Sequence, residues 1–304
     1  MLLDIIIIGS GPAGLAAGMY SGRLKMKTMV IGDSVGGTIA TTTNIENYPG
    51  FKKISGEALS MLLNEHALEY GAEILEDIVE NVERKNKHFY IETEEGESFT
   101  SRVIIFATGT RRRKLPAEGA DKFENRGVYY CALCDGPIFR DKVVAVVGGS
   151  DGAAKEALLL QEYASKVYII YRGEKIHPEP PNLRRIEESD KIEVINRTNI
   201  LEAKGDRKLR SVVLDREYKD SRELIINAVF VAIGGEPQSE LARNLGVKTN
   251  SKGEIIIDRE AKTNIDGVFA AGDVCDTKFK QVIVGVAEGV IAAYSAYGYN
   301  LHIS

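Results

Sequence analysis

Two copies of one sequence pattern constrain the fold of this 304-residue chain more than any other feature. In the first copy, Asp4–Ile8 ends in four isoleucines and runs into the glycine-rich segment Gly9–Gly14 and a small-residue helix expected over about Leu15–Lys25. The second copy begins at Lys142 and continues through a strand and a glycine-rich segment into a helix expected over about Ala154–Tyr163. Apolar β-branched runs that lead into glycine are typical of strands buried on both faces of a parallel sheet. The repeat therefore predicts two βαβ units and an α/β fold.

The segment between the two copies alternates between apolar and polar residues, which predicts antiparallel strands. The expected meander consists of Ile78–Arg84, His88–Glu94 and Ser98–Arg102, and a separate buried strand follows at Val103–Gly109. A similar series recurs at 210–234. Both the βαβ unit and the meander are therefore expected to be duplicated.

The tail after residue 242 is too short to form a domain of its own. It offers a strand at Gly267–Asp273 and a helix over about Gly285–Tyr297, which we expect to return to the first domain. The prediction is an α/β protein with two three-layer Rossmann-like dinucleotide-binding domains, the second inserted in the first. The first domain would comprise residues 1–112 and 242–304, and the second residues 113–241.

Composition excludes several functional classes. The formal net charge of −5 is mild and gives no indication of a nucleic-acid partner. No apolar run approaches the roughly 20 residues that span a bilayer, so we expect no association with a membrane. The 3 cysteines are too few for a disulfide scaffold. A cytoplasmic location is the expectation, and a cysteine pair kept in a reducing compartment is more often catalytic than structural.

Cys131 and Cys134 form a C-x-x-C pair, followed by Asp135, between the two glycine-rich units. This spacing brings two thiols within disulfide reach and commonly lowers the pKa of one of them. Half of a zinc site and chance spacing are the alternatives. A structural zinc site needs four N or S ligands, and only Cys275 and 4 scattered histidines remain, so no metal site is expected. The position favours a redox centre that passes electrons from a cofactor to another disulfide.

The first glycine-rich segment matches the dinucleotide fingerprint in the right context, directly after a strand and before a helix. Gly9 would allow the tight turn, and Gly11 would let the pyrophosphate approach the backbone. Gly14 would permit close packing of the helix on the strand. The acid expected after the second strand is not obvious, because Asp33 lies late. Asp273, at the end of the tail strand, offers a second polar anchor or a simple helix cap.

Taken together, these motifs resemble the low-molecular-weight thioredoxin reductases, class II of the FAD-dependent pyridine nucleotide-disulfide oxidoreductases. The resemblance extends from Ile5 to Tyr297. It rests on Gly9–Gly14, Glu46–Gly50, Ala107–Gly109, Cys131–Gly136, Ala232–Gly234 and Ala270–Val274, with Lys280 and Gln281 behind them.

The resemblance implies an FAD site and separate roles for the two cysteines. FAD would be bound by Gly9, Gly11, Pro12, Ala13, Gly14, Gly36, Gly37, Thr38, Asn47, Thr108, Gly109, Gly272, Asp273, Lys280 and Gln281. Thr38 stands where the family usually has Gln, so one flavin contact would differ. Cys134 would be the thiol next to the flavin, Cys131 would attack the substrate disulfide, and Asp135 would protonate the leaving thiolate.

The second nucleotide site departs from the family pattern. The resemblance assigns the pyridine nucleotide to Gly148, Gly149, Ser150, Asp151 and Arg172. Ser150 occupies the position of the second glycine, where a Cβ should crowd the pyrophosphate. Of the basic cluster that binds the 2′-phosphate of NADPH, only Arg172 remains. The donor is therefore NADH or NADPH, or a donor that is not a pyridine nucleotide, such as ferredoxin or a reduced deazaflavin.

The resemblance also implies partners, namely a thioredoxin or glutaredoxin-like protein and a second copy of the chain in a homodimer. A non-enzymatic redox-sensing flavoprotein is the alternative from another class, but a sensor does not need Asp135 beside the pair.

Two segments allow two interpretations each. Arg111–Lys114 is either a solvated linker or a basic segment that attracts an acidic protein partner. Pro178–Pro181 is either a rigid surface turn or a segment that closes the adenosine side of the second site.

Overall fold

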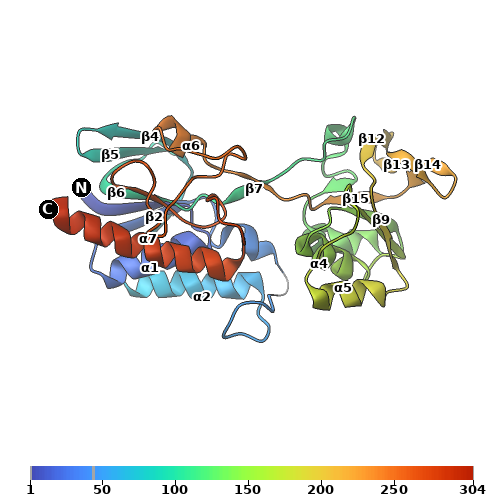
Figure 1. Ribbon diagram of the computed structural model, residues 1–304, viewed down its shortest axis with the longest axis horizontal. Coiled ribbons are helices and arrows are strands. Elements are labelled where there is room, and N and C mark those ends of the chain that lie inside the picture. Colours follow the sequence, from blue (N-terminus) through green and yellow to red (C-terminus); the bar gives the residue numbers. More distant parts are fainter. Residues whose placement is uncertain (1, 43–44, 304) are drawn as a thin grey trace. The chain divides into compact units, whose positions relative to one another are not determined.

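The computed structural model describes residues 2–42 and 45–303. The chain divides into two compact units. Unit 1 comprises Met1–Arg111 and Glu236–Ser304, and unit 2 comprises Arg112–Gly235. The two segments that connect the units, β7 (Thr110–Arg112) and β16 (Gly235–Pro237), pair as a two-stranded sheet. Because the chain leaves unit 1 and later returns to it, unit 2 is an insertion in unit 1 (Figure 1).

Unit 1 is built on a seven-stranded sheet with the order β3-β2-β1-β6-β5-β4, and β17 pairs with β6 outside this path. β1, β2, β3, β6 and β17 run parallel, whereas β4 and β5 are antiparallel. The strands are β1 (Leu2–Ile8), β2 (Thr28–Gly32), β3 (Glu73–Glu76), β4 (Val79–Lys85), β5 (His88–Thr93), β6 (Ser98–Phe106) and β17 (Val268–Ala270).

The meander of unit 1 differs from the prediction in one respect. Ser98–Arg102 and the following buried segment were expected to be two strands, but they form the single strand β6. Its first half pairs antiparallel with β5, and most of its length pairs parallel with β1. One strand can do both because it has two edges, each of which offers hydrogen-bonding groups to a neighbour.

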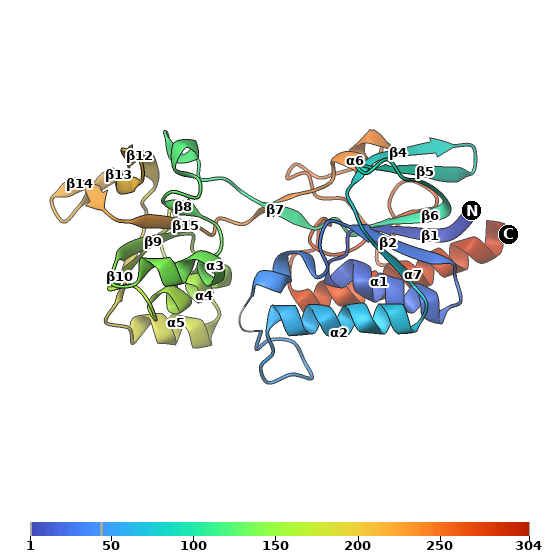
Figure 2. The same cartoon turned by 180° about the vertical axis from the view of Figure 1, so that it is seen from behind.

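The helices of unit 1 are α1 (Pro12–Arg23), η1 (Gly37–Thr41), α2 (Gly56–Glu69), α6 (Glu240–Asn244) and α7 (Val282–Ile303). α1 packs against both α2 and α7 on one face of the sheet (Figure 2). Ile5 and Ile7 point to this helical face, and Ile6 and Ile8 point to the other, where α6 and the chain up to Val274 complete the core. Successive strand residues face opposite sides, so a run of four isoleucines serves both cores.

α7 is the one helix among the described residues that is long and apolar enough, by length and composition alone, to cross a membrane. It packs against α1 through small residues, and Ala292, Ala293 and Ala296 are fully buried there. The approach is so close that a Cβ on Gly289 would lie 2.1 Å from the Ala13 carbonyl oxygen. One face of α7 is therefore part of the core of unit 1, whereas Ile291, Tyr294 and Leu301 on the same helix are exposed.

Unit 2 has a five-stranded parallel sheet with the order β11-β10-β9-β15-β8 and a separate three-stranded antiparallel sheet, β12-β13-β14. α4 and α5 cover one face of the parallel sheet, and the antiparallel sheet covers the other. The strands are β8 (Val128–Tyr129), β9 (Val143–Val147), β10 (Lys166–Ile170), β11 (Ile192–Ile195), β12 (Ile200–Gly205), β13 (Leu209–Tyr218), β14 (Ser221–Ile225) and β15 (Ala228–Val231).

The helices of unit 2 are η2 (Ala120–Phe123), α3 (Ala132–Asp135), η3 (Gly136–Phe139), α4 (Asp151–Leu160) and α5 (Pro180–Glu187). The interpretation of Pro178–Pro181 as a rigid surface turn was wrong for its second half, because α5 begins at Pro180. Proline suits the first helical turn, since its fixed φ matches the helix and its missing N–H would have no intrahelical partner. The α/β fold with two Rossmann-like domains is confirmed.

Candidate active site: a disulfide and two glycine-rich turns

Cys131, the N-cap residue of α3, and Cys134, within α3, form a disulfide with a Cα–Cα distance of 5.4 Å. The short helix α3 holds them at this distance. Its backbone turn is closed by the Asp135 N–H, which donates to the Cys131 carbonyl oxygen at 3.1 Å. The Cys134 N–H donates to the Cys131 sulfur at 3.2 Å. Cys134 is exposed and Cys131 half-buried, so the disulfide lies at the surface of unit 2 where a second disulfide could reach it.

Asp135 follows the pair directly and is half-buried. Burial raises the pKa of its carboxyl above the usual value of 3.8. A carboxyl with a raised pKa retains its proton closer to neutral pH, which is what a group that protonates a leaving thiolate requires. The environment of Asp135 therefore suits the role of acid.

The first glycine-rich turn joins β1 to α1 and has the geometry of a phosphate cradle. Gly9 has a φ of +112°, and Gly14 lies directly against it. Gly11 differs from both, because no atom lies within 4 Å of the position that its Cβ would occupy. No side chain caps the N-terminus of α1. Free N–H groups and open space beside Gly11 leave room for a pyrophosphate at the helix N-terminus, where the helix dipole favours negative charge.

Of the other predicted flavin residues of unit 1, Gly37 lies against this turn. Gly37 packs against Gly11, with its ideal Cβ 3.4 Å from the Gly11 Cα. Thr38 lies in η1, which begins at Gly37. The Asn47 amide donates to the Oε1 of Gln281 at 2.9 Å, which joins two segments separated by 234 residues. The fold thus brings together residues that the sequence places far apart.

Thr108 and Gly109 follow β6 and are held by Gln238, which sequence reasoning did not find. The Thr108 hydroxyl donates to the Gln238 carbonyl at 2.6 Å, and the Gln238 side chain donates to the Thr108 carbonyl at 2.8 Å. The Gln238 N–H donates to the Gly109 carbonyl at 3.0 Å. No motif marks Gln238, because its role depends on a segment 130 residues earlier in the chain.

Asp273 lies at the end of β17, after Gly272 with its φ of +81°. Burial raises the pKa of the Asp273 carboxyl, and the positive charge of Lys280 opposes this shift. The Lys280 ammonium donates to the Asp273 carbonyl at 2.7 Å and pairs with Glu254 at 2.6 Å. Lys280 thus contacts the backbone of the Gly272–Asp273 turn. Glu254 is a second residue that sequence reasoning missed.

These residues fit FAD. Gly11 leaves the open cradle that a dinucleotide needs, and Asp273 places a carboxylate at the end of a neighbouring parallel strand. The carboxyl ends of parallel strands are the usual site of ligands in open α/β sheets. FAD would therefore be held by the β1–α1 turn with Gly37, Asn47 and the Asp273–Gln281 segment.

The second glycine-rich turn, between β9 and α4, is more crowded. A Cβ on Gly149 would lie 2.5 Å from the ring of Tyr171. The same ring lies 2.5 Å from the position of a Cβ on Gly173. Ser150 carries a side chain at the position that corresponds to Gly11. The turn keeps the backbone of a nucleotide site, with Gly148 at a φ of +148°, but has less free space than its counterpart in unit 1.

Asp151 begins α4 and binds the segment that leads into α5. Its Oδ1 accepts hydrogen bonds from the Glu179 N–H at 2.9 Å and from the Asn182 amide at 2.8 Å. Lys155 pairs with its other oxygen at 3.0 Å. These partners, above all the hydrogen bond from Asn182, lower the pKa of Asp151 despite its burial. Asp151 therefore fixes the α4–α5 connection, a structural role that the sequence motif did not indicate.

The charges beside the second turn do not form a phosphate clamp. Arg172 is exposed. Arg197, which follows β11, pairs with the carboxylate of Glu174 at 2.8 Å. A phosphate monoester is usually held by several charge-assisted hydrogen bonds. Among the described residues beside this turn, the Arg197 guanidinium is thus already paired with a carboxylate.

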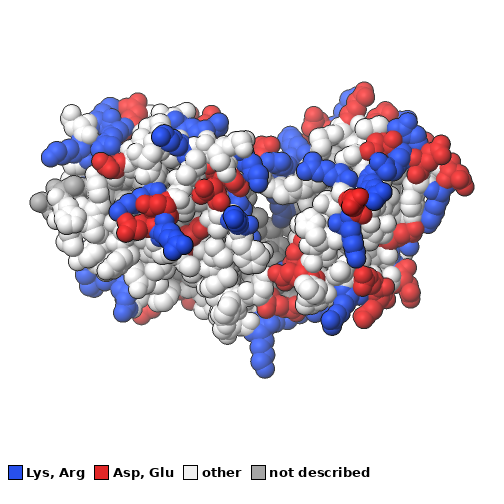
Figure 3. Space-filling view, in the orientation of Figure 1, with Lys and Arg blue, Asp and Glu red and all other residues white. Residues whose placement is uncertain are grey.

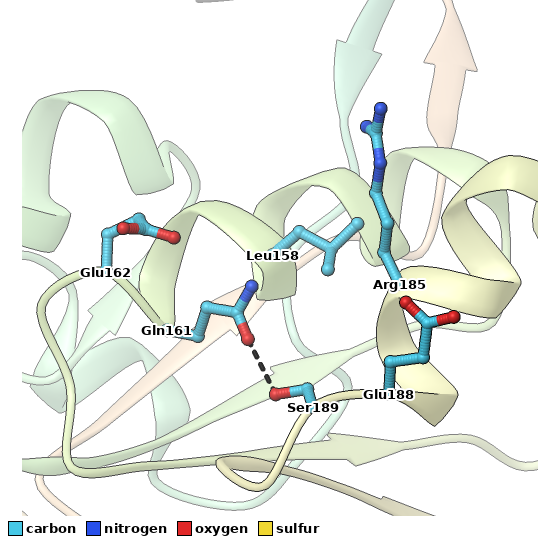
Figure 4. A pocket seen from close by; sticks show the side chains of 6 residues that line it. All are labelled: Leu158, Gln161, Glu162, Arg185, Glu188 and Ser189. Carbon is cyan, nitrogen blue, oxygen red and sulfur yellow. Dashed lines mark hydrogen bonds between the residues drawn. The ribbon is translucent and has the colours of Figure 1, made fainter.

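A cavity of about 400 Å³ in unit 2 lies apart from these turns. It is lined by Leu158, Gln161, Glu162, Arg185, Glu188 and Ser189 (Figure 4). The Ser189 hydroxyl donates to Gln161 at 2.6 Å across it. Gln161 caps the C-terminus of α4, whereas the glycine-rich turn lies at its N-terminus.

Within residues 2–42 and 45–303, no group of three His, Cys, Asp or Glu residues could hold a metal ion.

The basic segment Arg111–Lys114 lies where unit 1 passes into unit 2 and is mostly exposed, as expected of a solvated linker, although it also makes ion pairs. The Arg112 guanidinium lies 3.8 Å from the Glu156 carboxylate, and the Lys114 ammonium lies 3.1 Å from the Glu124 carboxylate.

Cys275 is fully buried, as a small core residue would be. On the face shown in Figure 3, positive and negative side chains are interspersed.

Comparison with known proteins agrees with this geometry. The pyridine nucleotide-disulphide oxidoreductase family matches residues 3–289. A thioredoxin reductase from Pneumocystis carinii is 39% identical over 96% of this chain and 94% of its own. The crystal structure of the Lactococcus lactis thioredoxin reductase is 38% identical, covers 99% of both chains and has a TM-score of 0.94. A ferredoxin-flavin thioredoxin reductase from Clostridium acetobutylicum is 33% identical over 100% of this chain and 99% of its own, with a TM-score of 0.54.

The resemblance expected from the motifs is therefore confirmed over nearly the whole chain. With its surface disulfide and its two glycine-rich turns, the chain belongs to the pyridine nucleotide-disulphide oxidoreductase family and, within it, to the thioredoxin reductases.

Proposed function

We propose that this enzyme takes electrons from NADH in preference to NADPH. Membership of the family implies FAD and a pyridine nucleotide, and thioredoxin reductases pass the electrons through a redox disulfide to a thioredoxin-like protein. We assign FAD to unit 1, the pyridine nucleotide to unit 2 and the redox disulfide to Cys131 and Cys134. The Glu174–Arg197 ion pair beside the second glycine-rich turn carries the proposed preference for NADH.

The chemistry of the cysteines balances in two steps. When bound and reduced, FAD would supply the electron pair that, with two protons taken up in the same step, converts the Cys131–Cys134 disulfide into two thiols. Cys131 then attacks the disulfide of the partner as a thiolate, forms a mixed disulfide and displaces one partner thiolate, which takes a proton from Asp135. Cys134 attacks the mixed disulfide, releases the second partner thiolate and restores the Cys131–Cys134 bond. A glutaredoxin-like partner would react in the same way.

The charges beside the second turn favour NADH for an electrostatic reason. Arg197 pairs with Glu174 at 2.8 Å and so adds no free cation to Arg172, which the sequence already indicated as the single residue left of the clamp. The carboxylate of Glu174 could accept a hydrogen bond from a ribose 2′-hydroxyl, which a 2′-phosphate cannot donate.

Stopped-flow reduction of the flavin with NADH and with NADPH tests the preference. We expect NADH to reduce the flavin at least about tenfold faster at equal subsaturating concentration, because one charge-assisted contact is worth roughly 1.5–3 kcal/mol. The Glu174→Ala variant should react faster with NADPH, since it frees Arg197. Glu187→Ala, an exposed acid on α5 of the same unit, is the control for net charge. Equal rates with the two nucleotides, or faster reduction by NADPH, would contradict the proposal.

A donor other than a pyridine nucleotide is the second candidate, and Ser150 favours it. Its side chain stands where Gly11 of the first turn leaves open space. The similar Clostridium acetobutylicum protein is named a ferredoxin-flavin thioredoxin reductase. If neither nucleotide bleaches the flavin but reduced ferredoxin or a photoreduced deazaflavin does, this second candidate replaces the first.

We also propose a cytoplasmic homodimer. A thiol pair that must be reduced again in every cycle is typical of a reducing compartment. Support for self-association comes from exposed apolar side chains of unit 1, namely Met61, Leu62 and Leu68 on α2 and Ile291 and Tyr294 on α7. Sedimentation velocity of the FAD-loaded protein checks the dimer, and a monomer at micromolar concentration would contradict it.

A further inference from the structure

We propose that Glu288 is a positioning residue of the flavin site. Its carboxylate lies on α7 and holds the Gly272–Asp273 turn that presents Asp273. No motif marks Glu288, and it lies 16 residues after the turn that it contacts. The inference depends on the proposed assignment of FAD to unit 1.

Both oxygens of the Glu288 carboxylate accept hydrogen bonds from one loop. Oε2 accepts from the Gly272 N–H at 2.8 Å, at the start of the loop. Oε1 accepts from the hydroxyl of Thr277, at its end. A single side chain thus fastens residues 272–277 at both ends to the first turns of α7. Hydrogen bonds to a charged acceptor are roughly twice as strong as neutral ones, so this contact restrains the loop more than a backbone turn alone.

Gly272 needs such a partner because the strand ends just before it. The Ala271 N–H still donates to the Phe106 carbonyl of β6 at 2.9 Å, which extends the pairing one residue beyond β17. The next N–H, that of Gly272, points instead at Glu288. Gly272 is buried and has a φ of +81°. A buried N–H without an acceptor is destabilising, so loss of Glu288 should allow the turn to move.

Movement of the Gly272–Asp273 turn would change the geometry of the proposed flavin site. A Cβ on Gly272 would lie 2.9 Å from the Ala13 Cβ, so the turn packs directly on the first fingerprint. On the other side of the loop, the Lys280 ammonium holds the Asp273 carbonyl at 2.7 Å. Glu288 and Lys280 therefore restrain the backbone on both sides of the Asp273 side chain, and Glu288 acts on the flavin through Asp273.

Reconstitution of the apoprotein with FAD, followed by the quenching of flavin fluorescence, tests the role. We expect Glu288→Ala to raise the FAD dissociation constant by about tenfold or more, the loss expected for a hydrogen bond to a charged group. Glu288→Gln should remain within about threefold of the wild type, because its amide can still accept from Gly272 and can donate to Thr277. Glu65→Ala removes an exposed acid on α2 of the same unit and is the matched control.

A merely structural role would give a different pattern. In that case Glu288→Ala would lower the melting temperature of the apoprotein and leave the FAD dissociation constant unchanged, which would overturn the proposal. A glutamine variant as defective as the alanine variant would also overturn it. If Glu288→Ala does not fold, Thr277→Val removes one of the two contacts, and FAD affinity equal to the wild type would then contradict the inference. Failure of the wild-type chain itself to bind FAD would instead refute the assignment of unit 1.

Discussion

Gly14 lies so close to Gly9 that a Cβ on Gly14 would come within 1.8 Å of the Gly9 carbonyl oxygen. Gly11, between them in the same fingerprint, has no atom within 4 Å of its ideal Cβ position. The three glycines therefore serve different purposes. Gly14 is needed for the packing of α1 on the turn, whereas Gly11 keeps space free for a ligand.

The two substitutions Gly11→Ala and Gly14→Ala should consequently separate binding from folding. Gly11→Ala should raise the FAD dissociation constant at least about tenfold, because the added methyl occupies the path of the pyrophosphate. The melting temperature of its apoprotein should stay within a few degrees of the wild type. Gly14→Ala should lower that temperature markedly or prevent folding, since backbone overlap cannot be relieved by a side-chain rotation. Equal melting temperatures for the two apoproteins would refute this division of roles.

Substitution of Cys134 by serine should abolish disulfide reduction and leave the protein yellow. FAD is assigned to unit 1 and the cysteines belong to unit 2, so flavin absorbance should persist while thioredoxin-dependent turnover falls by about 10³-fold or more. Cys275→Ser is the matched control, because Cys275 is the free cysteine and is buried in unit 1. Burial raises the pKa of its thiol well above the usual value, which makes it unreactive. Full turnover in the Cys134 variant would remove its assigned role.

Asp135→Asn should lower kcat by about 10²-fold, the usual contribution of a positioned acid. The wild-type carboxyl can donate only while protonated, so kcat should decline as the pH rises through its raised pKa. The asparagine variant should lack this decline. Asp141→Asn, an exposed acid in the same unit, should leave the pH profile unchanged. A pH profile of Asp135→Asn that parallels the wild type would assign the proton to another group.

Ionisation of the buried Glu156 carboxyl should lower the free energy of unfolding as the pH rises toward neutral. Burial raises the pKa of Glu156 from 4.5 to about 7, although the nearby Arg112 guanidinium opposes the shift. Its Oε2 is buried and has no hydrogen-bond partner among the described residues. Because the folded state then holds the proton more tightly than the unfolded chain, the free energy of unfolding falls as the pH rises from about 4.5 to 7. At about 1.4 kcal/mol per pKa unit, the loss is at most about 3.5 kcal/mol.

The Glu156→Gln variant isolates this contribution. Its urea midpoint should change less between pH 5 and pH 8 than that of the wild type, and the two proteins should differ most at pH 8. Glu187→Gln, an exposed substitution of the same kind on α5, should follow the wild type. Parallel pH profiles for Glu156→Gln and the wild type would show that the Glu156 carboxyl ionises normally.

Much of the fold could be predicted because its signals are local. The isoleucine run before Gly9, the second run before Gly148 and the Cys131–Cys134 spacing each lie within a few residues of chain, and local backbone chemistry determines what such segments form. Element limits were less well predicted. α4 begins at Asp151 and not near Ala154, and the expected break within β6 does not exist. Strand and helix ends depend on neighbouring elements, which a local pattern does not contain.

By itself the sequence determined the type of fold, the redox pair and the two candidate nucleotide turns. Only the tertiary structure decided which side chains meet. It paired Glu174 with Arg197, placed Gln238 against Thr108, and set Glu288 beneath the Gly272–Asp273 turn. The physical reason is that a glycine turn or a C-x-x-C pair is specified by adjacent residues. A hydrogen bond between distant segments exists only after burial of the core has brought their backbones together.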